Sequence, residues 1–96
     1  MIWRKKMTKK YYIGSVSERN GDMEYDTPYI FETGGDPNRY SDKVAKNWRG
    51  DWRGEIEEDK DFGGYWFDGT SLVYDGGNRE IPKEDFDVLK KYIYQA

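Results

Sequence analysis

The sequence contains no cysteine and no histidine among its 96 residues. Without cysteine the chain can form no disulfide, no thiolate metal site and no thiol nucleophile. Without histidine it lacks the commonest general base and the commonest transition-metal ligand. It also has no glycine-rich dinucleotide motif, no P-loop and no nucleophile elbow. These absences predict a protein that is not an enzyme and that holds no metal ion or cofactor.

Long apolar runs are missing as well. No stretch approaches the ~20 apolar residues of a membrane span, and no apolar segment follows the basic start MIWRKKMTKK, as a secretory signal would require. We therefore expect a soluble, cytoplasmic protein with no membrane partner. The length fits one domain. The hydrophobic fraction is only 35%, but the aromatic fraction of 18% predicts a folded, aromatic-rich core.

The charge is unevenly distributed. Residues 1–10 contain five basic groups and no acid, whereas the other residues contain eleven basic and nineteen acidic groups, a balance of −8. We expect a disordered basic tail at 1–9, with Met7 as an alternative start, followed by one acidic domain at 10–96. Such a domain repels nucleic acid and attracts basic surfaces.

An alternation of apolar and polar residues predicts an antiparallel hairpin of strands at 10–17 and 23–33. Asn20-Gly21 is predicted to form a type I′ turn, a register that places Val16 opposite Tyr25. Pro28 cannot donate to a ladder, so its nitrogen should face solvent or a bulge.

The rest of the chain predicts a helix, a second hairpin and a second helix. Asp36 is the expected N-cap of the first helix, Pro37 its first residue, and Gly50 its end. The second hairpin is expected at 65–67 and 71–75 around Asp68-Gly69, with a turn at Gly76-Gly77 and a short strand at 78–81. Pro82 begins the last helix. The residues expected in the core are Tyr12, Val16, Tyr25, Tyr29, Phe31, Val44, Trp48, Leu72, Phe86, Leu89 and Ile93.

The predicted fold is therefore a single α+β domain of order ββα-ββ(β)-α, an antiparallel sheet of four or five strands with two helices on one face. Residues 50–64 have neither a helical nor a strand period, and we expect an acidic loop there. It is open whether this loop is a solvated linker, a contact surface for a basic partner, or a calcium site in which Glu57, Asp59 and Asp61 alternate as in an EF-hand.

Aromatic residues flank the acidic loop. Tyr65 and Trp66 must point to opposite faces of one strand, so one should be in the core and the other exposed or covered by the loop. Trp52 is the aromatic residue most expected at the surface. On the second strand, Glu24, Asp26 and Glu32 form a row of carboxylates that is either an ordinary solvent face or a mimic of a phosphate backbone.

In its length, its acidic and aromatic composition, and segments such as IGSVSERNGDMEY and GGYWFDG, the chain resembles small proteins encoded by bacteriophages and other mobile elements. Some proteins of this type inhibit host defence, including anti-CRISPR and anti-restriction proteins. The resemblance implies an inhibitor acting in the host bacterial cytoplasm and assigns no site residues. The basic N-terminus differs from the acidic DNA mimics of that class.

The leading hypothesis is a non-catalytic protein that docks an acidic, aromatic-flanked surface on a basic partner, such as a nucleic-acid-processing complex. The alternatives are a nucleic-acid-binding module that uses the basic N-terminal arm and exposed aromatic residues, and a structural or assembly protein that pairs through an exposed strand edge. A homodimer is left open. The expected contact residues are Glu24, Asp26, Asp51, Trp52, Glu55, Glu57, Glu58, Asp59, Asp61 and Trp66.

Overall fold

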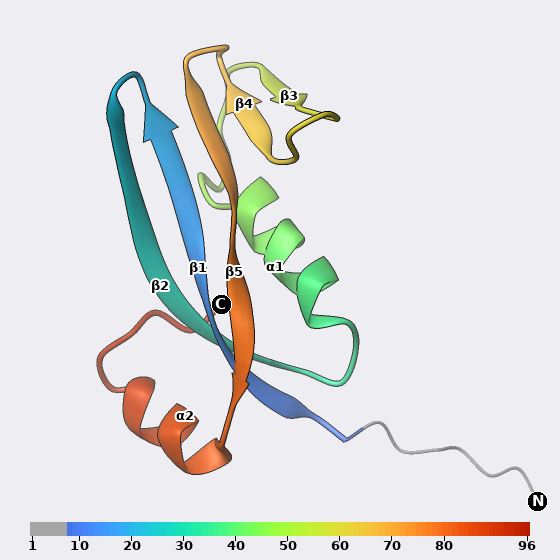
Figure 1. Ribbon diagram of the computed structural model, residues 1–96, viewed down its shortest axis with the longest axis vertical. Helices are drawn as coiled ribbons and strands as arrows, with labels where there is room; N and C mark the ends of the chain where they lie inside the picture. Colours follow the sequence, from blue (N-terminus) through green and yellow to red (C-terminus); the bar gives the residue numbers. More distant parts are fainter. Residues whose placement is uncertain (1–7) are drawn as a thin grey trace, which may run out of the picture.

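The computed structural model describes residues 8–96, so most of the predicted basic tail lies outside the described residues. The elements follow one another as β1 (Lys10–Asn20), β2 (Met23–Thr33), α1 (Pro37–Lys46), β3 (Ile56–Glu58), β4 (Tyr65–Phe67), β5 (Ser71–Ile81) and α2 (Lys83–Leu89) (Figure 1). The strands form one antiparallel sheet in the order β2-β1-β5-β4-β3. This confirms the α+β class. Neither of these helices is long and apolar enough to cross a membrane.

The first hairpin forms as predicted, but its register differs by two residues. Asn20 pairs with Met23, so the turn is Gly21-Asp22, and Val16 faces Thr27 rather than Tyr25. The predicted type I′ turn at Asn20-Gly21 needs a positive φ at both residues, but only Gly21 has one, of 64°. A glycine of positive φ at the first turn position suits a type II′ turn, whereas type I′ needs two such residues. Tyr25 consequently lies near the tip, 44% exposed, and is not in the core.

The two helices pack on opposite faces of the sheet, which corrects the expectation that both lie on one. Tyr12 stacks on Phe31, and Phe31 stacks on Tyr40 of α1. Neighbouring Tyr11 points to the other face, where its ring contacts Phe86 of α2. The sequence did not show this because β1 and β2 bury residues on both faces where α2 and the C-terminal segment cover the sheet; Ile30, for example, is fully buried.

Gly76-Gly77 lies inside β5 rather than in a turn. Val16 pairs with Asp75 and Gly14 with Asn78, so the two glycines oppose Ser15 alone in a β-bulge. Gly77 has a φ of 103°, which a glycine adopts without strain. The segments predicted as separate strands at 71–75 and 78–81 are therefore one long strand.

The predicted acidic loop contains β3. The strand that accompanies the second hairpin therefore precedes it, whereas a short strand after it, at 78–81, was expected. Ile56–Glu58 pairs with Tyr65–Phe67. Three residues are too few to show a strand period, which explains why the sequence did not reveal it. The Asp68-Gly69 turn is confirmed: both residues have a positive φ, of 54° and 69°, and the N–H of Thr70 donates to the carbonyl of Phe67 at 3.2 Å.

The core lies chiefly between the sheet and α1. The N-cap of α1 is confirmed, because the Asp36 carboxylate accepts the N–H of Asn38 at 2.9 Å. Of the expected core residues Val44, Trp48, Leu89 and Ile93 are only partly buried. The confirmed ones are Tyr12, Val16, Tyr29, Phe31, Leu72 and Phe86, and the structure adds Ile30, Ala45, Tyr65, Phe67 and Val73.

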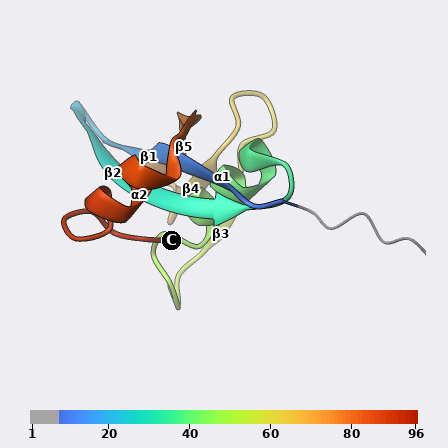
Figure 2. The ribbon, with the colours of Figure 1, turned by 90° about the horizontal axis from the view of Figure 1, so that it is seen from below.

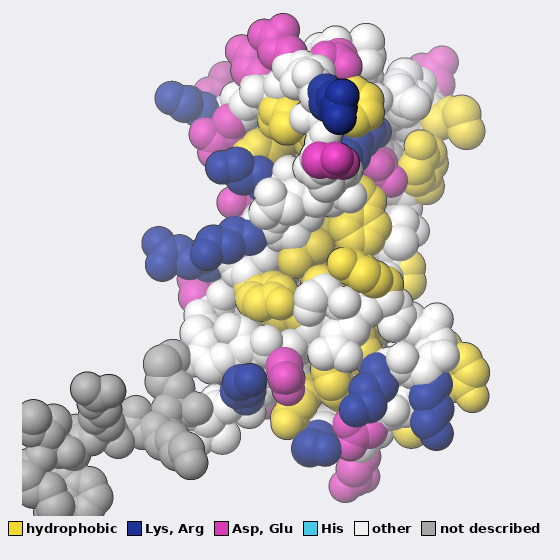
Figure 3. All heavy atoms as spheres, turned by 180° about the vertical axis from the view of Figure 1, so that it is seen from behind, with side chains coloured by type: hydrophobic (Ala, Val, Ile, Leu, Met, Phe, Trp, Pro, Cys, Tyr) yellow, Lys and Arg dark blue, Asp and Glu magenta, His cyan; other side chains and the backbone are white. Residues whose placement is uncertain are grey.

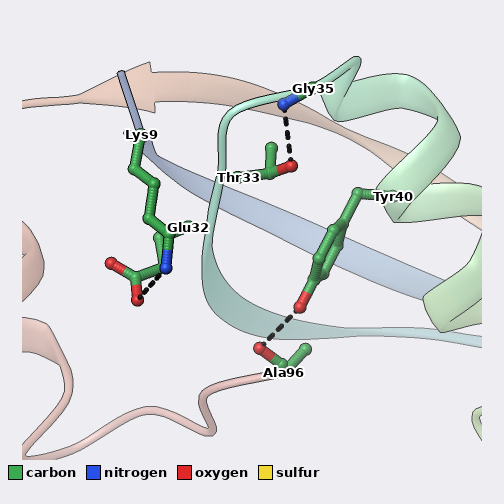
Figure 4. Close-up of polar contacts among 6 residues, drawn as sticks. All are labelled: Lys9, Glu32, Thr33, Gly35, Tyr40 and Ala96. Atoms are coloured by element: carbon green, nitrogen blue, oxygen red, sulfur yellow. Dashed lines mark hydrogen bonds and ion pairs between the residues drawn. The ribbon is translucent and has the colours of Figure 1, made fainter. Parts of the chain in front are cut away.

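The segment after α2 returns to the free edge of β2 (Figure 2). The N–H of Ile30 donates to the carbonyl of Tyr94, and the N–H of Ala96 donates to the carbonyl of Ile30, both at 2.9 Å. The Tyr40 hydroxyl donates to the Ala96 carbonyl at 3.0 Å (Figure 4). Near the start of β1, Lys9 pairs with Glu32 at 3.7 Å (Figure 4).

Candidate binding surface

Two acidic parts of the chain meet at the end of the molecule that is uppermost in Figure 1. Asn20 pairs with both Met23 and Ser71, and Ser71 pairs with Phe67, so the first hairpin tip lies beside the β3–β4 hairpin. We call residues 18–26 and 49–74 the acidic end. They contain eleven acidic and four basic residues, a balance of −7, whereas the other described residues balance at +1. In Figure 3 acidic side chains gather at this end.

The pairing register places one row of side chains across all five strands. Glu57 pairs with Trp66, Trp66 with Leu72, Leu72 with Arg19, and Arg19 with Glu24. Paired residues of a sheet point to the same face. Four predicted contact residues therefore share the face that α1 does not cover: Glu24, Asp26, Glu57 and Trp66.

The carboxylates of β2 on this face already have partners within the domain. Asp26 accepts the hydroxyl of Ser17 at 2.5 Å, and Glu24 accepts the hydroxyl of Tyr74 and pairs with Arg19 at 3.7 Å. The hydrogen bond to Glu24 raises the pKa of Tyr74. These bonds hold both carboxylates against the sheet, and Glu24 is partly neutralised by Arg19.

Asp59 holds the turn between β3 and β4 together. Its Oδ1 accepts the N–H groups of Asp61 and Phe62 at 3.1 and 2.9 Å, and its Oδ2 accepts the indole N–H of Trp66 at 3.0 Å. The N–H of Phe62, followed by the indole of Trp66, lowers the pKa of Asp59. Asp59 therefore stabilises the loop, and its role as a partner contact stays a prediction. An aspartate that accepts backbone N–H groups two and three residues later, followed by glycines, is typical of a tight turn.

Trp52 lies on the opposite face of the sheet from Trp66. Its ring meets Phe67 edge-on at 5.7 Å between centroids, and the guanidinium of Arg49 lies 5.2 Å from the centre of the Trp52 ring. Arg49 also pairs with Glu18 at 3.5 Å. Trp52 is 38% exposed, as predicted, but the structure does not bring it together with Trp66. Trp66 itself is half-buried beneath the loop, and Tyr65 is the one in the core.

Free carboxylates and exposed apolar side chains are both concentrated at the acidic end. Asp51, Glu55, Glu57, Glu58 and Asp61 are exposed, and their carboxylates make no ion pair or hydrogen bond with another residue of 8–96. Most of the large exposed apolar side chains lie here too. They are Met23, Tyr25, Trp52, Ile56 and Phe62. Sequence reasoning identified only Trp52 of this set. Met23 and Tyr25 fitted the pattern of the second strand, and Ile56 and Phe62 lie in the predicted acidic loop, where no periodicity indicated their exposure.

A hollow on the β3–β4 hairpin lies within this surface. Its volume is about 440 Å³, and its lining combines Trp66 with the four carboxylates of Glu57, Glu58, Asp59 and Asp61 and with one basic side chain, Lys60. Within residues 8–96 no three carboxylates are placed to hold a metal ion together. The calcium alternative therefore has no ligand cluster in this part of the chain. The size of the hollow and its acidic lining suit a cationic side chain.

Comparisons of the chain with models of protein families, with curated proteins and with solved structures give no match.

Proposed function

We propose that this protein acts by binding, and that its acidic end docks on a basic surface of a partner such as a nucleic-acid-processing complex. The observation that supports this most directly is the convergence of residues 18–26 and 49–74 into one end with a balance of −7. Clustered charge of one sign steers a complementary partner during encounter. Exposed rings such as Trp52 and Phe62, between the charges, provide the apolar contacts that hold a complex.

The bonding within the domain decides which residues would contact the partner. Glu24, Asp26 and Asp59 use acceptor atoms within the domain. Glu57 and Glu58 are exposed on the edge strand β3 and have no such partner. The direct contacts are therefore expected on β3 and its hollow, and the bonded carboxylates add to the field of the surface.

Pairing through a strand edge receives less support. Both backbone groups of Ile30 point to the outer edge of β2, so Pro28, Asp26 and Glu24 occupy the outward positions of this strand. Proline offers no N–H, and charged residues at an edge oppose the addition of another strand. The opposite edge, β3, has only three residues, of which two are glutamates.

The test compares two variants of equal net charge. Glu57→Lys with Glu58→Lys reverses the free carboxylates of the acidic end, and Glu84→Lys with Asp85→Lys reverses two exposed carboxylates of α2. The wild type and the two variants are immobilised separately, and each is exposed to the same lysate of the host cell. We expect proteins that the wild type and the α2 variant retain at low salt and that the β3 variant loses.

The affinity of a retained partner is then measured with purified proteins. We expect the β3 variant to bind at least about tenfold more weakly and with a smaller salt dependence. Equal affinity of the β3 variant and the wild type, or retention of nucleic acid alone, would overturn the proposal.

A further inference from the structure

A groove away from the acidic end lies between α1, the edge of β2 and the C-terminal segment. Its volume is about 580 Å³, within the ~300–1,000 Å³ of typical ligand pockets. Tyr40 and Val44 line it from α1, Trp48 lines it from the turn that follows α1, and Tyr94 and Ala96 line it from the C-terminal segment. None of its lining residues belongs to the acidic end, and none has an acidic side chain.

Aromatic residues that line this groove pack against residues of the core. Tyr40 stacks on Phe31 with 4.6 Å between centroids, and Trp48 lies against Tyr29 at 6.3 Å. Tyr94 meets Trp48 edge-on at 5.9 Å. Because these rings are packed against others, binding needs little ordering of the walls. Val44 and the packed rings give the groove an apolar lining, which suits an inserted apolar side chain.

A row of basic residues runs along α1 beside the groove. Arg39, Lys43 and Lys46 follow one another at i, i+4 and i+7, so they share one side of the helix. All three are exposed, and no carboxylate of residues 8–96 lies within 4 Å of their charged groups. Lys43 itself lines the groove. An apolar groove with cations along one wall is complementary to an anionic ligand that carries an apolar group.

We propose that this groove binds an acidic peptide segment of a partner protein, which inserts a large apolar side chain between α1 and Tyr94. The carboxylates that flank this side chain meet Lys43 and Lys46. The site is independent of the proposed docking of the acidic end, because it has the opposite charge and uses other residues. One molecule could therefore hold a basic and an acidic partner surface at once.

The test uses a synthetic six-residue peptide with phenylalanine and leucine at its centre and two glutamates on each side. Its addition to the ¹⁵N-labelled protein should shift the Trp48 indole resonance saturably. A peptide with two central alanines should bind at least about tenfold more weakly, because it lacks the apolar group. The absence of a saturable shift at Trp48, or equal binding of the alanine peptide, would overturn the proposal.

Charge variants locate the contact. Lys43→Glu with Lys46→Glu should weaken peptide binding at least about tenfold, whereas Arg79→Glu with Lys91→Glu, of the same net charge, should bind as the wild type does. Lys43→Gln with Lys46→Gln repeats the test without reversing charge near the helix end. Equal weakening by the control pair would contradict the placement. A partner that binds the acidic end should not distinguish these variants from the wild type.

Two other occupants are tested in the same way. Tighter binding of decathymidylate than of the peptide at Trp48 would mean that the ligand of the groove is a nucleic acid. Concentration-dependent self-association that Lys43→Glu with Lys46→Glu abolishes would identify the occupant as the acidic end of a second copy. Either result would overturn the proposal of a partner peptide.

Discussion

The indole N–H of Trp66 donates to Oδ2 of Asp59 at 3.0 Å, while Oδ1 of the same carboxylate accepts the N–H groups of Asp61 and Phe62. One side chain thus joins β4 to the turn that precedes it. The shape of the hollow beside Glu57 depends on this contact, because Asp59 and Trp66 both line it. The charge of Asp59 therefore contributes to the structure of the acidic end as well as to its field.

Acid should release this turn. The hydrogen bonds lower the pKa of Asp59 in the folded protein below the ordinary value of 3.8. Their stabilisation is therefore complete above the unfolded-state pKa and is lost as the pH falls through the folded-state pKa. We expect the Trp66 indole resonance to hold its position from neutral pH down to about pH 4 and to move below it. A transition centred above pH 4 would contradict this assignment.

Asp59→Asn should loosen the same turn at neutral pH. An asparagine can accept the backbone N–H groups with its oxygen, but its amide nitrogen then faces the indole N–H of Trp66 and cannot accept it. We expect faster hydrogen exchange at Asp61 and Phe62, with little change in β1 and β2. Asp61→Asn is the matched control, since the Asp61 carboxylate makes no hydrogen bond with the described residues, and its exchange should resemble that of the wild type.

Gly14 is required where the Tyr29 ring crosses β1. A Cβ at this position would lie 3.0 Å from Cζ and 3.1 Å from the hydroxyl of Tyr29, and 3.2 Å from the carbonyl oxygen of Gly77. Tyr29 is fully buried, so its ring cannot move aside freely. Gly14→Ala should lower the free energy of unfolding by about 1–3 kcal/mol, measured by urea denaturation.

Gly35→Ala is the control for this substitution. The nearest atom to its added Cβ is Oγ1 of Thr33 at 3.7 Å, an ordinary contact, and its φ lies outside the left-handed region. We expect a change within about 0.5 kcal/mol. Equal effects of the two substitutions would show that the approach of Tyr29 to Gly14 does not determine the cost.

Local patterns predicted the elements better than their arrangement. Asp36-Pro37 and Asp68-Gly69 were interpreted correctly because the residues that act are adjacent in the chain. Gly76-Gly77 was not, since a turn and a bulge use the same glycines and only pairing with Ser15 distinguishes them. The alternation along β2 likewise gave the face of Tyr25 correctly but could not show that it lies beyond the core.

The same limit applies to the candidate surface. The sequence identified the acidic loop and the acidic face of β2 as separate features. Their union depends on pairing across five strands from Glu57 to Glu24, which involves residues far apart in the chain. The structural role of Asp59 and the opposite placement of Trp52 and Trp66 also follow from this pairing. Composition therefore predicted the charge of the surface but not which carboxylates are free.

Arg49 should stabilise the acidic end through several contacts at once. Its guanidinium pairs with Glu18 at 3.5 Å and lies 4.9 Å from the centre of the Phe67 ring; the two charged side chains are only 22% and 14% exposed. Arg49→Met keeps much of the apolar stem and removes the charge. We expect a loss of about 1–2 kcal/mol in the free energy of unfolding, because Glu18 is left half-buried without a partner.

A second substitution separates the ion pair from the ring contacts. In Glu18→Gln, Arg49→Met should cost less than in the wild type, by about 0.5–1 kcal/mol, since no buried charge remains to be left unpaired. Arg19→Met, at an exposed pair with Glu24, should change stability by less than about 1 kcal/mol. A zero coupling between Arg49 and Glu18 would mean that the ring contacts alone position Arg49.

Tyr65 should make stability decline at high pH. Burial, together with the hydrogen bond that its hydroxyl donates to Asp42 at 2.8 Å, raises its pKa to about 12. The neutral phenol is favoured in the folded state, so its stabilisation is complete below the unfolded-state value of 10.0. It is then lost as the pH rises through the folded-state value. The free energy of unfolding should therefore fall between about pH 10 and pH 12.

The contribution of Tyr65 is isolated by subtracting the tyrosinate absorbance of Tyr65→Phe from that of the wild type during an alkaline titration. We expect the difference curve to have a midpoint near the value given above. In Asp42→Asn the midpoint should fall but stay above the ordinary tyrosine value, because burial is the larger cause and is unchanged. A difference curve that titrates at the ordinary value would place Tyr65 in water and contradict its position in the core between β4 and α1.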